Sequence, residues 1–232
     1  IDVDTSIFYK WLGVNRGMNA GVYFFIALPL LTAFAYSWSV SYDRNSGYIS
    51  QIITRTSRKK YFTAKFLVTF ISGGIIFAGA LILDYVLLAI FSPAYTPIPG
   101  DLASSMDPFH FCSEIFYQNP YLFMLIWFGI AFLWGGAMSC ISMAAGMLIK
   151  KYVISSIVPF LVFTAEQILA LYVMQRYTIT VKGTSIGLVW TDMLYAAPMT
   201  TSLPEHILLC IALIIMISTL IYILRGRKYE CL

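Results

Sequence analysis

The chain has 232 residues, of which 59% are hydrophobic and only 11% are charged, and its net charge is +4. Soluble domains carry about 25% charged residues, so this composition excludes an ordinary soluble protein. Continuous apolar runs also exclude a transmembrane β-barrel, whose strands alternate over segments of about ten residues. The composition therefore predicts an all-α polytopic membrane protein.

Five apolar runs are long enough to form membrane-spanning helices, because about 20 residues at about 1.5 Å each cross a hydrocarbon core of about 30 Å. They follow an N-terminal segment, residues 1–20, which we expect to lie outside the cell. We expect one transmembrane domain over residues 1–232, with spans at 21–40, 62–91, 120–149, 152–175 and 207–224.

The N-terminal segment lacks a charged region followed by an apolar core, so it does not resemble a signal peptide. Five spans with an external N-terminus and no targeting signal are unusual for a bacterial-type inner membrane protein. The chain also begins with Ile1 and not with Met. We therefore expect a sixth span before Ile1 in the native chain.

Basic residues gather after the first, third and fifth predicted spans, with eleven of the fifteen on that side and four on the other. The positive-inside rule makes the richer side cytoplasmic, so we expect a cytoplasmic C-terminus in a plasma or inner membrane of bacterial type. Each basic cluster adjoins the end of a span and no basic domain exists. Nucleic acid is therefore not an expected partner.

The connection between the first two spans, residues 41–61, contains a predicted amphipathic helix. Four apolar residues fall on one helical side, with polar residues elsewhere: Tyr48, Ile49, Ile52 and Ile53. Asp43, Asn45 or Ser46 is the expected N-cap. Such a helix docks into a groove on another protein or lies on the lipid surface. Its short length favours the groove.

Two later segments have distinctive compositions. Small residues recur over Trp134 to Gly146 in the third span, which predicts close helix packing, either within the chain or at a subunit interface. The apolar part of residues 176–206 runs from Ile186 to Pro198 and is interrupted by Asp192, so it is too short to cross the membrane. We expect an external re-entrant or interfacial helical pair there, before the last span.

Asp84 and Glu166 are the only acidic residues inside the predicted spans. An ionisable group at membrane depth indicates function by default, so the two carboxyls are candidates for a proton or cation pathway. The alternative is structural. Asp84 is seven residues before Ser92 and can reach the interface, and Glu166 beside Gln167 can be a hydrogen-bonded packing residue.

Sequence motifs of hydrolytic enzymes, including HExxH, GxSxG and the Walker GxxxxGK[ST] loop, do not occur in the chain. We therefore do not expect an enzyme, nor a bound cofactor or metal in this chain. If ATP supplies energy, its hydrolysis must take place on a partner.

The stretch "DRNSGYISQIITRTSRKKYFTAKF", lying between two spans, resembles the permease subunits of type-2 ATP-binding-cassette transporters. The signature that enters the second span in that family is matched by Thr56, Ser57, Arg58, Tyr61 and Lys65. The order of the other parts is similar as well, although the family's acid-glycine turn is less standard here, as Asp43 to Gly47.

The resemblance implies a six-span permease that works with a soluble ATPase subunit, which binds ATP and Mg²⁺, and with a second permease copy or homologous permease in the lipid bilayer. It also implies that residues 46–55 form a coupling helix seated in a cleft of the ATPase. Its docking residues would be Tyr48, Ile49, Ile52, Ile53, Arg55 and Arg58.

The sequence thus predicts the membrane subunit of an ATP-driven exporter for an amphiphilic, peptide or drug-like substrate. Two alternatives stay open. One is an ion-coupled secondary transporter or channel that uses Asp84 and Glu166. The other is a non-catalytic membrane scaffold or immunity protein.

Overall fold

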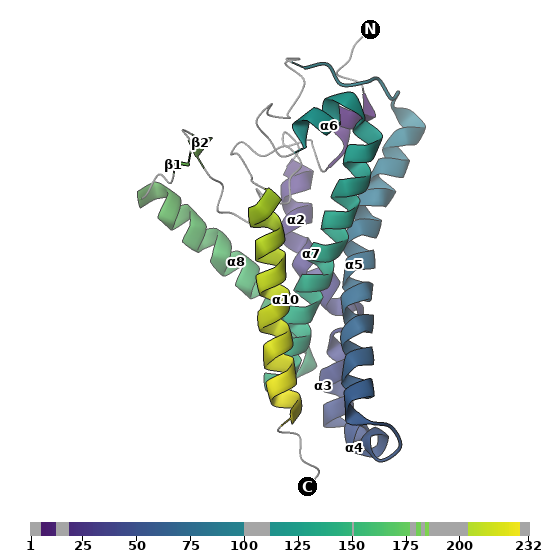
Figure 1. The fold of residues 1–232 in the computed structure, drawn as a ribbon, viewed down its shortest axis with the longest axis vertical. Coiled ribbons are helices and arrows are strands. Elements are labelled where there is room, and N and C mark those ends of the chain that lie inside the picture. Colours follow the sequence, from purple (N-terminus) through teal and green to yellow (C-terminus); the bar gives the residue numbers. More distant parts are fainter. Residues whose placement is uncertain are drawn as a thin grey trace. The chain divides into compact units, whose positions relative to one another are not determined.

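The computed structural model describes residues 6–12, 19–99, 112–149, 151–176, 180–181, 184–185 and 204–227. Within these ranges the chain is almost entirely helical (Figure 1). The elements are α1 (Ile7–Lys10), α2 (Asn19–Tyr36), α3 (Trp38–Asn45), α4 (Tyr48–Ile53), α5 (Arg58–Phe91), α6 (Ser113–Gln118), α7 (Pro120–Leu148), α8 (Tyr152–Arg176), β1 (Thr180–Val181), β2 (Thr184–Ser185) and α10 (Pro204–Arg227).

The predicted all-α polytopic fold is confirmed for the described part of the chain. It contains five helical segments long and apolar enough to cross a membrane: Tyr23–Asn45, Arg58–Phe91, Pro120–Leu148, Tyr152–Leu169 and Ile207–Gly226. The first of these continues beyond the expected end at Val40, because α3 follows α2 after a break at Ser37. This protein is therefore a multi-pass membrane protein.

The predicted re-entrant pair at 176–206 lies mostly outside the described residues, including its whole apolar part, 186–198. Between the fourth and fifth spans the described residues include a short antiparallel ladder, which the sequence did not lead us to expect. In it Thr180 pairs with Ser185, and Val181 pairs with Thr184.

The described chain divides into two compact units, and the five spans contribute a part to each. The first unit comprises residues 1–26, 78–131 and 163–208, and the second comprises 27–77, 132–162 and 209–232. The units are therefore not successive stretches of sequence. Each has its own packed interior.

In the first unit, residues 6–12 of the N-terminal segment pack against α5 and α7. Phe8 and Trp11 are fully buried, and their rings make edge-to-face contacts with Tyr121 and Phe128 of α7. The Trp11 indole N–H donates to the carbonyl of Leu81 on α5 at 3.3 Å. A buried Trp needs such an acceptor, so this bond fixes the segment in place.

In the second unit, α5 and α7 approach closely because glycines face each other. A Cβ on Gly73 would lie 2.7 Å from the carbonyl oxygen of Gly135, and a Cβ on Gly135 would lie 2.6 Å from the carbonyl oxygen of Gly73. Only glycine fits at both positions. The small-residue segment of the third span therefore serves packing within the chain, at least at Gly135.

Hydroxyl groups join α2, the break between α2 and α3, α7 and α8 in the interior of the second unit. The Ser37 hydroxyl donates to Ser142 at 2.7 Å, and Ser142 donates to the carbonyl of Ser155 at 3.1 Å. Ser139 donates to the carbonyl of Thr32 at 2.7 Å. These side chains are fully buried, so each bond satisfies a polar group that water does not reach.

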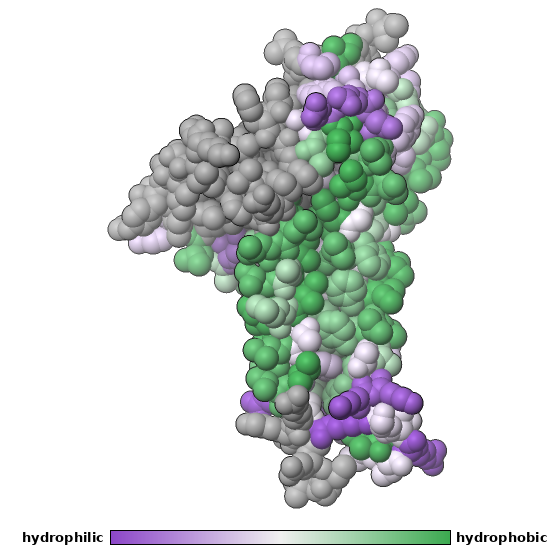
Figure 2. All heavy atoms as spheres, in the orientation of Figure 1, coloured by the Kyte–Doolittle hydropathy of each residue, from purple (hydrophilic) through white to green (hydrophobic). Residues whose placement is uncertain are grey.

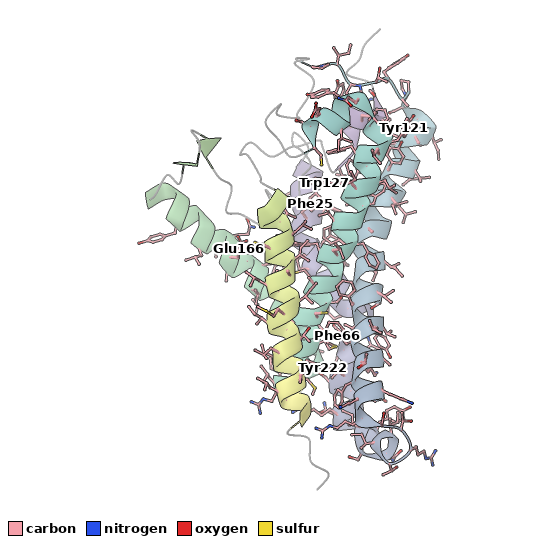
Figure 3. The ribbon with its side chains drawn as sticks, in the orientation of Figure 1. Phe25, Phe66, Tyr121, Trp127, Glu166 and Tyr222 are labelled. Atoms are coloured by element: carbon pink, nitrogen blue, oxygen red, sulfur yellow. The ribbon has the colours of Figure 1, made fainter. Side chains whose placement is uncertain are left out.

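The last span, α10, packs on α5 through aromatic rings. Tyr222 is buried with Met143 and Met147 of α7, and the rings of Phe62 and Phe66 pack on it with centroids 5.3 and 6.4 Å away. Figure 3 shows Phe66 and Tyr222 side by side. Val40 of α3 belongs to the same cluster, so four helices meet there.

Candidate functional site

The predicted amphipathic helix exists as α4, a six-residue helix between the first two spans. Gly47 precedes it with φ of 73°, a left-handed conformation that favours glycine. Its N–H donates to the carbonyl of Arg44, so the chain turns sharply from α3 into α4. In Figure 1, α4 lies beneath the end of α3.

The predicted N-cap is wrong. Gly47 occupies that position, and no side chain caps the helix there. Asp43 and Asn45 are instead part of α3, and the Ser46 hydroxyl bonds back to the carbonyl of Asp43 at 3.3 Å. The helix α3 runs farther than the sequence suggested, and this places the expected capping residues before the turn.

The four apolar residues of α4 differ in exposure. Ile49 is 3% exposed and packs into the second unit, whereas Tyr48 is 47% exposed. Ile52 and Ile53 are half-buried. The accessible apolar surface of α4 therefore consists of Tyr48, Ile52 and Ile53, and Ile49 anchors the helix.

A buried charge cluster, which the sequence did not predict, supports the turn before α4. Asp43 of α3 forms an ion pair with Lys65 of α5, with Oδ2 and Nζ 2.6 Å apart and both side chains about 12% exposed. The Tyr61 hydroxyl donates to the same Oδ2 at 2.6 Å. Lys65 also donates to the Tyr36 hydroxyl at 3.2 Å.

The two charges of this cluster are 22 positions apart in the sequence, yet they hold α3 and α5 together on either side of α4. A buried pair with several hydrogen bonds resists separation, because parting it would leave a charge buried alone. The base of the α4 turn is therefore fixed by charge as well as by packing.

Arg44 extends this support to α7. Its guanidinium donates to the carbonyls of Gly146 at 3.2 Å and Met147 at 2.9 Å. These carbonyls belong to the last turn of α7, where the helix itself supplies no N–H donor for them. A cation is also favoured at this end of a helix dipole.

The two remaining cations of the predicted docking set lie at the ends of the connection. Arg55 follows α4 and is exposed. Arg58 begins α5 and is half-buried, with its guanidinium 5.9 Å from the centre of the Phe62 ring. Figure 2 shows hydrophilic residues gathered around this end of the second unit.

Asp84 of the first unit binds the N-terminal segment. Its Oδ2 accepts the backbone N–H of Leu12 at 3.0 Å, next to the Trp11 bond to Leu81. The carboxylate accepts from a backbone N–H that lies two residues beyond the end of α1. This contact supports the structural interpretation of Asp84 over the ion-pathway interpretation.

Replacing Asp84 with leucine should therefore loosen the N-terminal segment, because the Leu12 N–H loses its acceptor at a cost of about 1–3 kcal/mol. We expect faster tryptic cleavage after Lys10 in the purified chain. Asp84→Asn keeps an acceptor oxygen and should be cleaved at the wild-type rate. Equal protection of all three proteins would contradict this role.

Glu166 lies on α8 in the first unit and is half-buried (Figure 3). Its Oε2 accepts a hydrogen bond from the Gln167 side chain at 3.0 Å. The neighbouring amide was the partner expected from the sequence. This contact leaves both interpretations of Glu166 open.

Within the described residues, no group of three His, Cys, Asp or Glu side chains is arranged to hold a metal ion. Comparison of this chain with known proteins found no matching family model, no matching curated protein and no matching solved structure.

Proposed function

We propose that this chain is the membrane-spanning permease subunit of an ATP-driven exporter, and that α4 docks on a separate soluble ATPase. The observation that carries the proposal is the way in which the helices on either side of α4 are bonded to each other and to α7. Helix α4 presents apolar side chains outside the spans, while α3 and α5 on either side of it are held together by the Asp43–Lys65 ion pair.

A coupling element has two physical requirements. It needs accessible surface for the partner, which Tyr48, Ile52 and Ile53 supply. It also needs a stiff connection to the spans, so that a push on α4 moves them and does not merely bend a loop. The bonds of Asp43 to α5 and of Arg44 to α7 supply that connection.

A helix that only anchored the protein to lipid would need the apolar surface. It would not need neighbouring helices that are held together by buried ion pairs and hydrogen bonds. The amphipathic pattern alone does not separate these two roles. The buried charges at the base of α4 favour the mechanical role. They also agree with the resemblance of this segment to type-2 permeases.

In the proposed complex, two permeases, identical or homologous, face each other in a plasma or inner membrane with the basic ends of their spans in the cytoplasm. ATP and Mg²⁺ are bound by the ATPases, and this chain supplies no catalytic residue. Closure of the ATPases shifts α4 and, through α3 and α5, tilts the spans. The cargo is an amphiphilic, peptide or drug-like molecule.

The double variant Ile52→Asp, Ile53→Asp tests the proposal. Two carboxylates on the docking surface would have to be desolvated in the ATPase cleft, so ATPase association and transport should fall at least tenfold, because charge burial is costly. Co-purification of a soluble ATPase with the tagged chain from native membranes, together with transport in vesicles, measures both effects.

Two matched variants on α4 serve as controls. Gln51→Asp adds a charge at an exposed position and should retain ATPase association. Ile49→Asp places a charge at a buried position and should reduce the thermal stability of the permease itself. Normal association and transport by the Ile52, Ile53 variant would refute docking through α4.

The ion-coupled alternative depends on the Glu166–Gln167 pair on α8. It predicts that Glu166→Gln abolishes transport while no ATPase is needed. Transport that continues in the Glu166→Gln variant and stops without ATP would exclude this alternative.

A further inference from the structure

We propose that the start of α5 and the end of α10 form a binding site for the phosphate of an anionic phospholipid. The site consists of Arg58, Phe62 and Arg225. This inference does not depend on ATP-driven transport, and it stands on contacts within the second unit alone.

The two helix ends lie together on one side of the membrane. The Tyr222 hydroxyl of α10 donates to the carbonyl of Phe62 on α5 at 3.3 Å. A Cβ on Gly226 would lie 3.7 Å from the Phe62 ring. Arg58 is the first residue of its apolar span and Gly226 is the last residue of its own. The site is therefore at the level of the lipid headgroups.

Arg58 has a donor without an acceptor. Its Nη2 atom is buried and makes no hydrogen bond with the residues that the structure describes. The guanidinium lies beside the Phe62 ring, which supplies a cation–π contact but no acceptor. A charged donor without an acceptor among the described residues is costly, and Arg58 as a whole is only half-buried, so an acceptor in the headgroup layer would stabilise this side chain.

The described charges beside Arg58 on the two helix ends are positive, and the carboxylate of Asp43, which accepts from Tyr61, is already paired with Lys65. Lys59 and Lys60 follow Arg58 and are exposed, and the first turn of α5 contains no acidic residue. The N-terminal end of a helix carries a partial positive charge, so these cations are repelled by the helix dipole as well as by each other. Arg225, also exposed, adds a cation from α10 immediately before Gly226. An anion bound here would balance these charges.

A phospholipid phosphate fits these requirements best. It is abundant at this depth, it offers several acceptor oxygens, and arginine binds phosphate through two parallel hydrogen bonds. Phe62, which packs on the buried Tyr222 and is itself only half-buried, provides an apolar surface beside the charged group for the first part of an acyl chain. Anionic lipids concentrate in the cytoplasmic leaflet, the side to which these basic helix ends are assigned.

The test measures lipid binding to the full chain in a neutral detergent by native mass spectrometry. The probes are short-chain phosphatidylglycerol and phosphatidylcholine of the same chain length. We expect phosphatidylglycerol to bind more tightly. Arg58→Gln and Arg225→Gln should each weaken its binding about fivefold, the contribution of one cation near an anionic surface. Arg58→Lys should lie between Arg58→Gln and the wild type, because lysine keeps the charge but not the paired donors.

Lys151→Gln is the matched control, because it removes one exposed cation of the same unit, at the start of α8. Its affinity should be that of the wild type. Circular dichroism and gel filtration check folding, and Arg225→Gln changes an exposed residue, so it tests the site even if Arg58→Gln does not fold.

Four results would overturn the proposal. The first is equal binding of the two lipids, and the second is an equal loss in Lys151→Gln, which would indicate general surface charge. The third is displacement of the lipid by inorganic phosphate at the same concentration, which would indicate a free phosphate site. The fourth is unchanged lipid binding with loss of ATPase association in Arg58→Gln, which would indicate an acidic protein partner.

Discussion

Replacing Asp43 with leucine is expected to destabilise the protein by about 3 kcal/mol, because Lys65 is then left as an unpaired charge in a buried site. The Tyr61 hydroxyl loses its acceptor in the same variant. Denaturation of the purified protein in detergent, followed by circular dichroism, measures the loss. Lys59→Met is the control, since it removes an exposed cation of the same helix.

The double variant Asp43→Leu, Lys65→Met separates the charge effect from general damage. Two apolar side chains of similar volume remove both charges, so most of the lost stability should return. Transport should stay low in the double variant, because the charged connection between α3 and α5 is gone. If the double variant is as unstable as Asp43→Leu, the ion pair is not the cause of the loss.

Gly135→Ala is expected to push α5 and α7 apart and to destabilise the protein by about 2 kcal/mol. The new methyl group would lie 2.6 Å from the carbonyl oxygen of Gly73, and a backbone atom cannot move aside as a side chain does. The better helix propensity of alanine, about 1 kcal/mol, offsets only part of this clash. Gly73→Ala should have a similar effect.

Two other glycines of the same helices provide matched controls. A Cβ on Gly79 of α5 or Gly129 of α7 would have no neighbouring atom within 4 Å. Alanine at either position should leave stability unchanged or raise it by up to about 1 kcal/mol. Thermal denaturation of all four variants in one detergent makes the comparison. Equal behaviour of Gly135→Ala and Gly129→Ala would show that the helices do not meet at Gly135.

Both predictions concern how α4 is connected to the spans. The Asp43–Lys65 pair holds the two helices on either side of α4, and the Gly73–Gly135 contact holds α5 against α7. If α4 is pushed by a partner, these contacts carry the displacement to α3, α5 and α7 within the second unit. Variants that weaken them should therefore reduce transport more than they reduce binding of the ATPase.

The amino-acid sequence by itself determined that the described part of the chain contains five segments long and apolar enough to cross a membrane, and approximately where they lie. Hydrophobic length is enough for this, because each spanning helix satisfies its own backbone hydrogen bonds and needs only about 20 apolar residues. The sequence also located α4 between the first two spans, since its apolar residues repeat with helical spacing.

The partners of individual side chains were decided only by the tertiary structure. Periodicity placed Ile49 with Tyr48, Ile52 and Ile53, but the packing of the second unit buried Ile49 and left Tyr48 exposed. Asp43 was one of the expected N-cap residues of the amphipathic helix, and in the structure it is the ion-pair partner of Lys65. Asp84 proved to hold the Leu12 N–H. Such contacts join positions far apart in the chain, so they depend on how helices pack and not on any local pattern.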